Sequence, residues 1–370
     1  MVTPGSAPTT TPVGDVARLI DGGDMDCGSG LLLLITRAMR RLDSGDLLAV
    51  RSAEASVVTD LPVWAELVGH EVVVELAETR GGPWWFAVRK DGAGADGVAR
   101  PEAGTVFSTG GRTPVGHRLW AYTNFDCNLA CLYCCAESSP KADARRLDPE
   151  VVGPLFAQFR DQGGRELLLT GGEPFMHPQL GELVDAAAGL ERTILTNAMV
   201  FGRGRRRELL ESIDRDVVMQ VSLDSATPEI HDRMRGAGSW ARALDGIGLA
   251  HSLGFRVKIA ATRLDEDPEG VRELHERLDA EGIAQEDRVI RPVAAEGFAD
   301  SGIHVSIDSL EPEPVITADG AWWHPVAVTN PHMRIADAPL DLDEIFGVVR
   351  DTLRVQDAAS AAGREVFRCA

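Results

Sequence analysis

Residues 119–134, LWAYTNFDCNLACLYC, decide the fold of the larger part of this chain. The stretch begins with a short apolar run, which is typical of a buried strand, and leads directly to Cys127, Cys131 and Cys134. Three thiolates with these spacings can converge from one loop and leave one position of a metal site open. The spacing leaves two alternatives at this point, a zinc site that acts as a Lewis acid and a four-iron cluster with one free iron.

Short β-rich runs then alternate with helical patterns as far as residue 293. We predict strands at 119–123, 166–170, 193–196, 217–223, 256–262 and 288–293, and helices at 149–162, 180–190, 206–213, 238–253 and 269–281. This alternation is typical of the α/β class and predicts a partial (β/α)6 TIM-like barrel over residues 117–299. Its chemistry should lie at the C-terminal ends of the strands.

Polar residues follow the predicted strands at that edge. The second strand ends in Thr170-Gly171-Gly172-Glu173-Pro174, where the glycines allow a backbone to approach a ligand and Glu173 can pair with an ammonium group. The third strand ends at Asn197, and the fourth is followed by a hydroxyl and a carboxylate suited to ribose hydroxyls, those of Ser222 and Asp224. An amino-acid-like ligand is indicated.

These ordered motifs, from about Trp120 to Ala294, resemble the radical S-adenosylmethionine (SAM) family. The matching pieces are the three-cysteine loop with Tyr133, GGEP, the TN and SLD strand ends, HDRMRGAGSW (231–240) and GFRVKIAAT (254–262). The resemblance implies a [4Fe-4S] cluster held by Cys127, Cys131 and Cys134, with SAM on its open iron. It further implies that Gly171, Gly172 and Glu173 hold the methionine end, Ser222, Asp224 and Asn197 the ribose, and Tyr133 the adenine.

The family's chemistry follows from the same resemblance. A reduced cluster cleaves SAM, and the resulting 5′-deoxyadenosyl radical abstracts a hydrogen atom from the substrate. The implied partners are an electron donor such as a flavodoxin or ferredoxin and an unidentified peptide or small-molecule substrate.

Residues 14–90 read as a small βαβαββ two-layer α/β sandwich, with strands at 16–20, 47–52, 71–78 and 84–89 and helices at 31–42 and 61–67. They resemble the TusA/SirA-like sulfur carriers in Ile20-Asp21, in Cys27 before a helix, in Gly45-Asp46-Leu47-Leu48, in the DLPVWAEL segment from Asp60 and in Gly69-His70-Glu71-Val72. In that family the cysteine carries a persulfide, here implying a cysteine desulfurase-type sulfur donor. Glycines replace the family's two prolines after the cysteine, so a docking module without sulfur transfer is the alternative.

The tail, residues 300–370, resembles the SPASM/twitch-like extensions of peptide-modifying radical SAM enzymes, in the run from Val315 to Trp323 and in a closing helix. We predict strands near 304–307, 314–316 and 326–328 and a helix over 342–353. Those extensions bind extra clusters through several cysteines, whereas this tail has only Cys369. A single cluster per chain is therefore predicted.

Charge and composition bound the remaining functions. Acidic residues exceed basic ones by 20, which disfavours nucleic acid and anionic membranes as partners. The N-terminus has no export signal, and clustered thiols should stay reduced, so we predict a cytoplasmic protein. Residues 1–13 are predicted to be a disordered tail and residues 91–116 a linker.

Three other features favour ordinary structural roles. Cys135 should be a buried neighbour, because adjacent side chains diverge and the ligand triad is complete without it. The arginine run 203–207 is typical of a solvated helix start, and His177 should pack in the turn after GGEP.

Three functions remain open from the sequence. The leading hypothesis couples radical chemistry to sulfur delivery from Cys27. The second is a radical SAM peptide or small-molecule modifier whose N-terminal module only docks a partner. The third is a sulfur-relay or iron–sulfur scaffold without turnover.

Overall fold

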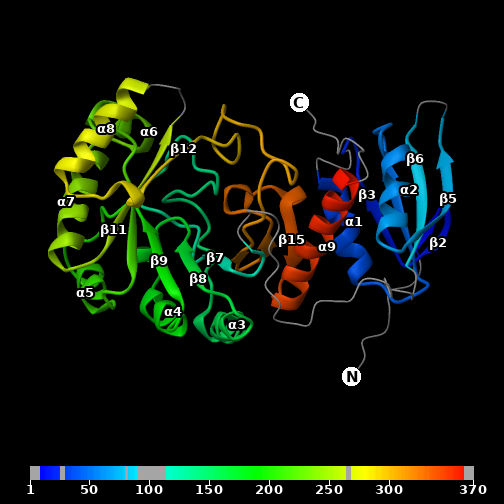
Figure 1. The fold of residues 1–370 in the computed structure, drawn as a ribbon, viewed down its shortest axis with the longest axis horizontal. Coiled ribbons are helices and arrows are strands. Elements are labelled where there is room, and N and C mark those ends of the chain that lie inside the picture. The colour runs from blue at the N-terminus through cyan, green and yellow to red at the C-terminus, as the bar shows by residue number, and fades with distance from the viewer. Residues whose placement is uncertain (1–8, 26–29, 80–81, 91–113, 264–267, 362–370) are drawn as a thin grey trace.

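The computed structural model describes residues 9–25, 30–79, 82–90, 114–263 and 268–361. Figure 1 shows a small α/β module built from the N-terminal residues, a large sheet flanked by helices, and between them the C-terminal tail. Among the described helices, none is both long enough and apolar enough to traverse a bilayer. Residues 91–113 of the predicted linker and Cys27 lie outside the described residues.

The N-terminal module has the predicted βαβαββ order. Its elements are β3 (Arg18–Asp21), α1 (Leu32–Arg40), β4 (Leu47–Ser52), α2 (Val57–Leu67), β5 (Glu71–Ala77) and β6 (Trp84–Arg89). The sheet order is β3-β4-β6-β5, with β3 and β4 parallel across the α1 crossover and the other pairs antiparallel. The helices bury their apolar sides against one face of this sheet, forming a core that includes Leu31, Ile35, Leu48, Leu61 and Phe86.

The prediction of disorder over residues 1–13 is wrong at its end. Residues of β1 (Thr9–Thr11) pair antiparallel with β2 (Gly14–Val16). Gly14, at φ +109°, supplies the left-handed backbone that this tight connection needs. The hairpin was not predicted because the segment has low hydrophobicity and no alternating apolar pattern.

Six parallel strands form the large sheet in the predicted order. They are β7 (Arg118–Tyr122), β8 (Glu166–Thr170), β9 (Glu191–Thr196), β10 (Val218–Ser222), β11 (Val257–Arg263) and β12 (Arg288–Pro292). The connections carry α3 (Pro149–Asp161), α4 (Leu180–Ala186), α5 (Arg205–Ser212), α6 (Pro228–Arg235), α7 (Ser239–Ser252) and α8 (Pro268–Ala280). Of these helices only α6 was not predicted; it has just eight residues, and Gly236 and Gly238 separate it from α7.

The two faces of this sheet differ in composition. Residues such as Leu169, Ile194, Met219 and Ile259 are fully buried and belong to the core that packs against the helices. The intervening residues form the opposite, inner face of the curved sheet, which is more polar and includes Thr193, Gln220, Ser222, Lys258 and Thr262. Side chains alternate between faces along each strand, so the register assigns these residues to a common surface.

The tail extends the sheet beyond β7. Strand β13 (Val315–Thr317) pairs in parallel with β7, and β14 (Gly320–Trp322) and β15 (Arg334–Asp337) follow antiparallel, giving nine strands in all. The strand predicted at 304–307 is absent from the described chain, and residues 326–328 fall in a 3-10 turn, so these two predictions are wrong. Helix α9 (Leu342–Ala361) closes the tail.

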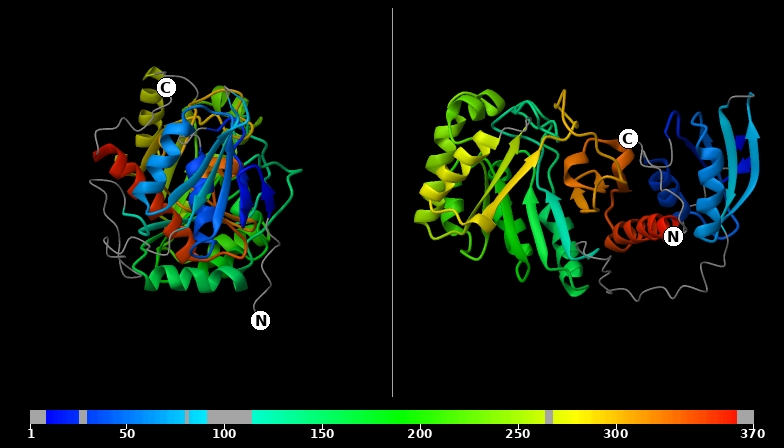
Figure 2. Two further views of the ribbon diagram at one scale, coloured as in Figure 1. Left: turned by 90° about the vertical axis from the view of Figure 1, so that its right-hand side faces the viewer. Right: turned by 45° about the horizontal axis from the view of Figure 1, so that its top comes forward.

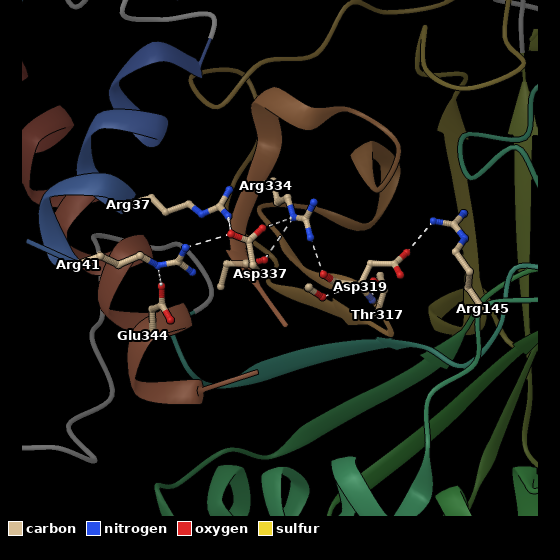
Figure 3. A network of polar contacts seen from close by, with 10 residues as sticks. Arg37, Arg41, Arg145, Thr317, Asp319, Arg334, Asp337 and Glu344 are labelled. Atoms are coloured by element: carbon tan, nitrogen blue, oxygen red, sulfur yellow. Dashed lines mark hydrogen bonds and ion pairs between the residues drawn. The ribbon is translucent and has the colours of Figure 1, made fainter. Parts of the chain in front are cut away.

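Helix α1 joins the N-terminal module to the tail, which lies between the module and the six parallel strands in Figure 1 and in the right-hand view of Figure 2. Its Ile35 packs in the core of the module, whereas Leu33 packs in the large core. Arg37 and Arg41 form ion pairs with Asp337 of β15, the latter at 3.0 Å, and Arg41 also pairs with Glu344 of α9 (Figure 3).

The polar network continues from the tail to the large sheet (Figure 3). Arg334 bridges the Asp337 carboxylate, at 3.1 Å, and the carbonyl oxygen of Asp319, at 2.5 Å. The Asp319 carboxylate pairs with Arg145 at 2.7 Å, and the Arg145 guanidinium lies 3.8 Å from the centre of the Phe125 ring. Phe125 is two residues before Cys127, so the network ends beside the cysteine loop.

Candidate functional site

The predicted site residues come together at the C-terminal edge of the parallel sheet. The cysteine loop follows β7, the GGEP turn follows β8, Asn197 follows β9 and Asp224 follows β10. Because these strands are parallel and adjacent, their ends open onto the same edge. Cys27 is outside the described residues, so its position relative to this edge is not assigned.

Backbone N–H groups donate hydrogen bonds to two of the three thiols of the cysteine loop. The Leu129 N–H donates to Cys127 Sγ at 3.4 Å, and the Ser138 N–H donates to Cys134 Sγ at 3.3 Å. Burial raises the pKa of Cys127, and it raises the pKa of Cys131 to about 11 against the opposing charge of Arg235. Buried thiols with N–H donors aimed at sulfur are suited to becoming thiolates when a metal centre supplies the compensating charge.

Asn197 connects the third strand end to this loop. Its Nδ2 donates to Asn128 Oδ1 at 2.8 Å and lies 3.9 Å from Cys127 Sγ. Its own backbone N–H donates to Glu173 Oε2 at 2.9 Å. In this arrangement Asn197 bridges the cysteine loop and the GGEP turn, whereas the sequence had indicated only a ribose contact.

The two glycines of GGEP allow that turn to pack on the start of the cysteine loop. A Cβ at Gly171 would overlap the backbone of Asn124, and one at Gly172 would overlap the carbonyl group of Asp126. The Gly172 N–H donates to the Asn124 oxygen at 2.7 Å, and the Glu173 N–H donates to the Asp126 oxygen at 3.1 Å. The glycines therefore serve close approach between two segments of this chain.

Glu173 is fully buried beneath the turn. Its Oε1 accepts hydrogen bonds from the Phe175 N–H at 3.1 Å and from Thr196 Oγ1 at 2.8 Å, and its Oε2 accepts one from Asn197. Burial, opposed by these donors, raises the pKa of Glu173 to about 7. A carboxylate has about four acceptor positions, so one remains for an ammonium group.

Tyr133 and Asp224 contact each other in a second cluster at the same edge. The Tyr133 hydroxyl donates to Asp224 Oδ2 at 2.5 Å, and the Thr262 N–H donates to Oδ1 at 3.0 Å. Arg235 forms a bidentate pair with Asp224 at 2.7 and 3.1 Å and lies over the Tyr133 ring. Both charged side chains are buried, with 9% and 1% of their surfaces exposed. Asp224, the carboxylate predicted to bind the ribose hydroxyls, thus already accepts four hydrogen bonds from within the protein.

Sequence reasoning missed Arg235, although it lies within the quoted HDRMRGAGSW motif. The signal was its place at the end of a helix, four residues after His231, whose Nδ1 accepts a hydrogen bond from the Asp224 N–H at 3.1 Å. Ser222 lies on the inner face of β10, in register with Ala260 of the neighbouring strand β11. Its hydroxyl has no hydrogen-bond partner among the described residues.

Of the three features given structural roles, His177 packs in its turn and the arginine run starts a helix, as predicted, whereas Cys135 is only half-buried. The Cys135 thiol is half-buried and lies 4.0 Å from the Tyr122 hydroxyl, while the Cys135 carbonyl oxygen accepts a hydrogen bond from Thr329 Oγ1. His177 is buried and caps the turn after GGEP by accepting from the Gln179 N–H at 3.1 Å. The arginine run begins the exposed helix α5.

Three thiols on one loop are a ligand set that suits an iron–sulfur cluster with one open iron. Within the described residues, no three His, Cys, Asp or Glu side chains approach closely enough to ligate one metal ion. In a four-iron cluster each thiolate binds a different iron, so the three sulfurs need only face one region. Cys127, Cys131 and Cys134 come from one short loop after β7, which is compatible with that requirement.

The radical SAM superfamily model matches residues 123–278 of this chain. The subtilosin biosynthesis protein AlbA of Bacillus subtilis is 30% identical over 155 residues, which cover 41% of this chain and 34% of AlbA. The GTP 3′,8-cyclase of Rhizobium meliloti is 35% identical over 166 residues, covering 41% of this chain and 46% of the cyclase. This chain thus spans less than half the length of these curated relatives.

Solved structures show the same fold. The structure titled "Native anSMEcpe with bound AdoMet and Cp18Cys peptide" superposes with a TM-score of 0.51 at 13% identity, covering 68% of this chain and 84% of that one. Its partial TIM barrel corresponds to the parallel strands described above. The fold class predicted from the sequence is confirmed.

Proposed function

Because residues 123–278 form a radical SAM domain, we propose that this chain is an enzyme that removes a hydrogen atom from its substrate with a [4Fe-4S] cluster and SAM. When bound, these two groups supply the 5′-deoxyadenosyl radical that performs the abstraction. One observation carries the proposal. Asn197 joins the thiol of Cys127 to the buried carboxylate of Glu173, so cluster ligands and an ammonium acceptor share one edge.

The chain's first task is to hold the cluster through Cys127, Cys131 and Cys134. The N–H donors of Leu129 and Ser138 stabilise negative charge on two of these sulfurs. Phe125 packs in the large core just before the loop and fixes where the loop leaves the sheet. The loop is thereby preorganised before ligands arrive.

The second task is to orient SAM. Glu173 offers its remaining acceptor position to the SAM ammonium group, which would restore its ordinary ionisation despite burial. Ser222, with an unengaged hydroxyl, is the proposed ribose contact. We assign Asp224 to positioning: its pair with Arg235 holds the Tyr133 ring at the cluster loop, where that ring can face the adenine.

Anaerobic reconstitution tests this function. We expect wild-type protein to bind one four-iron cluster per chain and to form 5′-deoxyadenosine when reduced with SAM. Cys131→Ala should lose both properties, whereas Cys135→Ala, which changes the adjacent thiol, should keep them. Zinc in place of iron and sulfide, or full SAM cleavage by Cys131→Ala, would refute the assignment, and a cluster without SAM cleavage would support a scaffold.

The finer proposal is sulfur delivery from a persulfide on Cys27, which comes from the resemblance to sulfur carriers. In the transfer, a substrate carbon radical would bond to the terminal sulfur while the S–S bond breaks. One electron from a flavodoxin- or ferredoxin-type donor would then restore the Cys27 thiolate.

A docking module without transfer is the alternative, supported by the ion-paired interface of α1 with the tail. After treatment with a cysteine desulfurase and cysteine, intact-mass measurement should find one added sulfur atom on wild type. Cys27→Ala should lack the adduct, and Cys369→Ala should retain it. An unloaded wild type would favour the docking module, as would undiminished turnover of a peptide or small-molecule substrate by Cys27→Ala.

A further inference from the structure

Two cationic side chains lie on the inner face of the sheet. Lys258 of β11 is in register with Gln220, and Arg291 of β12 is in register with Thr262. Their strand neighbours Ile259 and Ile290 pack toward the helix-side core, so alternation places Lys258 and Arg291 on the opposite side. Both cations are half-buried.

Arg291 is level with the cluster of Tyr133 and Asp224. Its register partner Thr262 donates its backbone N–H to Asp224 Oδ1. Lys258 precedes Thr262 by four residues and therefore lies about 13 Å deeper along the strand direction. The inner face thus carries one positive charge at the site edge and another farther inside.

Neither cation has a carboxylate partner within the described ranges of the chain. Most other arginines near the large sheet do, including Arg118 with Glu166, Arg192 with Asp216, Arg235 with Asp224, Arg256 with Asp287 and Arg288 with Asp279. The inner face consequently keeps two uncompensated positive charges in a chain whose formal net charge is −20. Half-buried charges without partners favour an external anion.

The charge of Arg291 also acts on groups across the site. Burial raises the pKa of Tyr122 and Cys135 and lowers the pKa of His324, and in each case the positive charge of Arg291 makes a smaller contribution in the lowering direction. These residues belong to β7, to the cysteine loop and to the tail. The charge of Arg291 on β12 therefore acts on groups of the segments across the site.

We propose that Arg291 binds an oxyanion of the substrate, a carboxylate or a phosphate, and that Lys258 adds attraction from deeper in the barrel. This inference rests on the proposed function, because it assumes that the substrate enters the inner face. A planar guanidinium suits either oxyanion through two parallel hydrogen bonds. An anchor level with Asp224 would hold the substrate beside the cofactor without using the residues assigned to SAM.

Arginine modification by phenylglyoxal, mapped by peptide mass spectrometry on the reconstituted full chain, tests the proposal. The probes are inorganic phosphate and glutarate, added at constant ionic strength with and without SAM. At saturation, one or both should slow modification of Arg291 at least about tenfold, the effect expected of a charge-assisted contact. Arg203, an exposed arginine, should not be protected. Phosphate alone would identify a phosphorylated substrate, and glutarate alone a carboxylate.

A Lys258→Gln variant separates a specific site from general charge. Losing one positive charge at this distance should raise the probe concentration for half-protection about threefold to tenfold. Equal protection of Arg291 and Arg203, no protection, or an Arg291 that the reagent cannot reach would overturn the proposal. Complete protection by SAM alone would also overturn it, because Arg291 would then belong to the SAM site.

The proposed function is judged separately by iron, sulfide and 5′-deoxyadenosine. If those assays fail while the anions still protect Arg291, the proposed radical function is refuted and the anion-binding site stands. Normal SAM cleavage with no anion protection would refute only the Arg291 assignment.

Discussion

Replacing Asp224 by Asn should strongly destabilise the large sheet. The change removes the negative charge that faces Arg235. It also replaces one carboxylate oxygen, which accepts two hydrogen bonds, by an amide nitrogen that can only donate. Both members of the pair are buried, so the Arg235 charge would be left uncompensated inside the protein. Breaking such a pair costs about 3–5 kcal/mol, several times the worth of an exposed pair.

Urea unfolding of the apo protein, followed by circular dichroism, measures this loss. The matched control is Glu211→Gln, which breaks the exposed pair with Arg207 on α5 and should cost about 0.5 kcal/mol or less. Because removing both charges leaves no orphan, Asp224→Asn combined with Arg235→Gln should cost less than the sum of the two single changes. A cost below about 1 kcal/mol for Asp224→Asn, or additive single costs, would refute the buried-pair argument.

The same pair predicts acid sensitivity. Burial alone would raise the pKa of Asp224, but the charge and hydrogen bonds of Arg235, with those of Tyr133 and Thr262, hold it below its ordinary value. A carboxyl with a lowered folded pKa stabilises the protein above its unfolded pKa, about 3.9, and this stability is lost as pH falls through the folded pKa. Asp224→Asn should lack that part of the acid transition.

Three further predictions concern other parts of the molecule. Gly172→Ala should displace the cysteine loop and lower iron and sulfide per chain after reconstitution, whereas Gly202→Ala, with open space at its Cβ, should not; equal iron contents would contradict the packing argument. The raised pKa of Glu173 favours its protonated form in the folded state, so the unfolding free energy of the wild type should fall by about 3 kcal/mol as pH rises from about 4.5 to 7. Glu173→Gln should lack this decline, and an unchanged slope in urea titrations at several pH values would refute the reasoning. Asp337→Ala should speed hydrogen exchange in α1 but not in β8, since the pairs of Arg37 and Arg41 hold α1 on the tail (Figure 3); unchanged exchange in α1 would mean that apolar packing suffices.

The local patterns predicted most elements well. The bounds of β4, β6 and β8 agree with the predicted runs, because each is a short apolar segment between turn residues. The tail was predicted less well. Residues 326–328 are apolar and include two valines, yet Pro325 and a cap from His324 make the turn that precedes β15. Local propensity cannot reveal that β13 completes its hydrogen bonds on β7, nearly 200 residues earlier in the chain.

The candidate site divides in the same way. The spacing of Cys127, Cys131 and Cys134 and the glycines before Glu173 are properties of one segment each, so the sequence alone located the cysteine loop and the GGEP turn. The partners of these groups come from other strands. Arg235 reaches Asp224 from α6, and Asn197 reaches Cys127 from the end of β9.

The sequence by itself determined the order of the elements and the chemistry of the short motifs, because periodicity, turn residues and ligand spacing act over a few residues. Only the tertiary structure decided which charges are compensated. Asp224 is paired with Arg235 of a helix, whereas Arg291 and Lys258 have no carboxylate partner within the described chain. Pairing depends on the register of distant strands and on burial, which no short segment of sequence contains. The strand register places Lys258 and Arg291 on the same face of the sheet, where they form the proposed anion site.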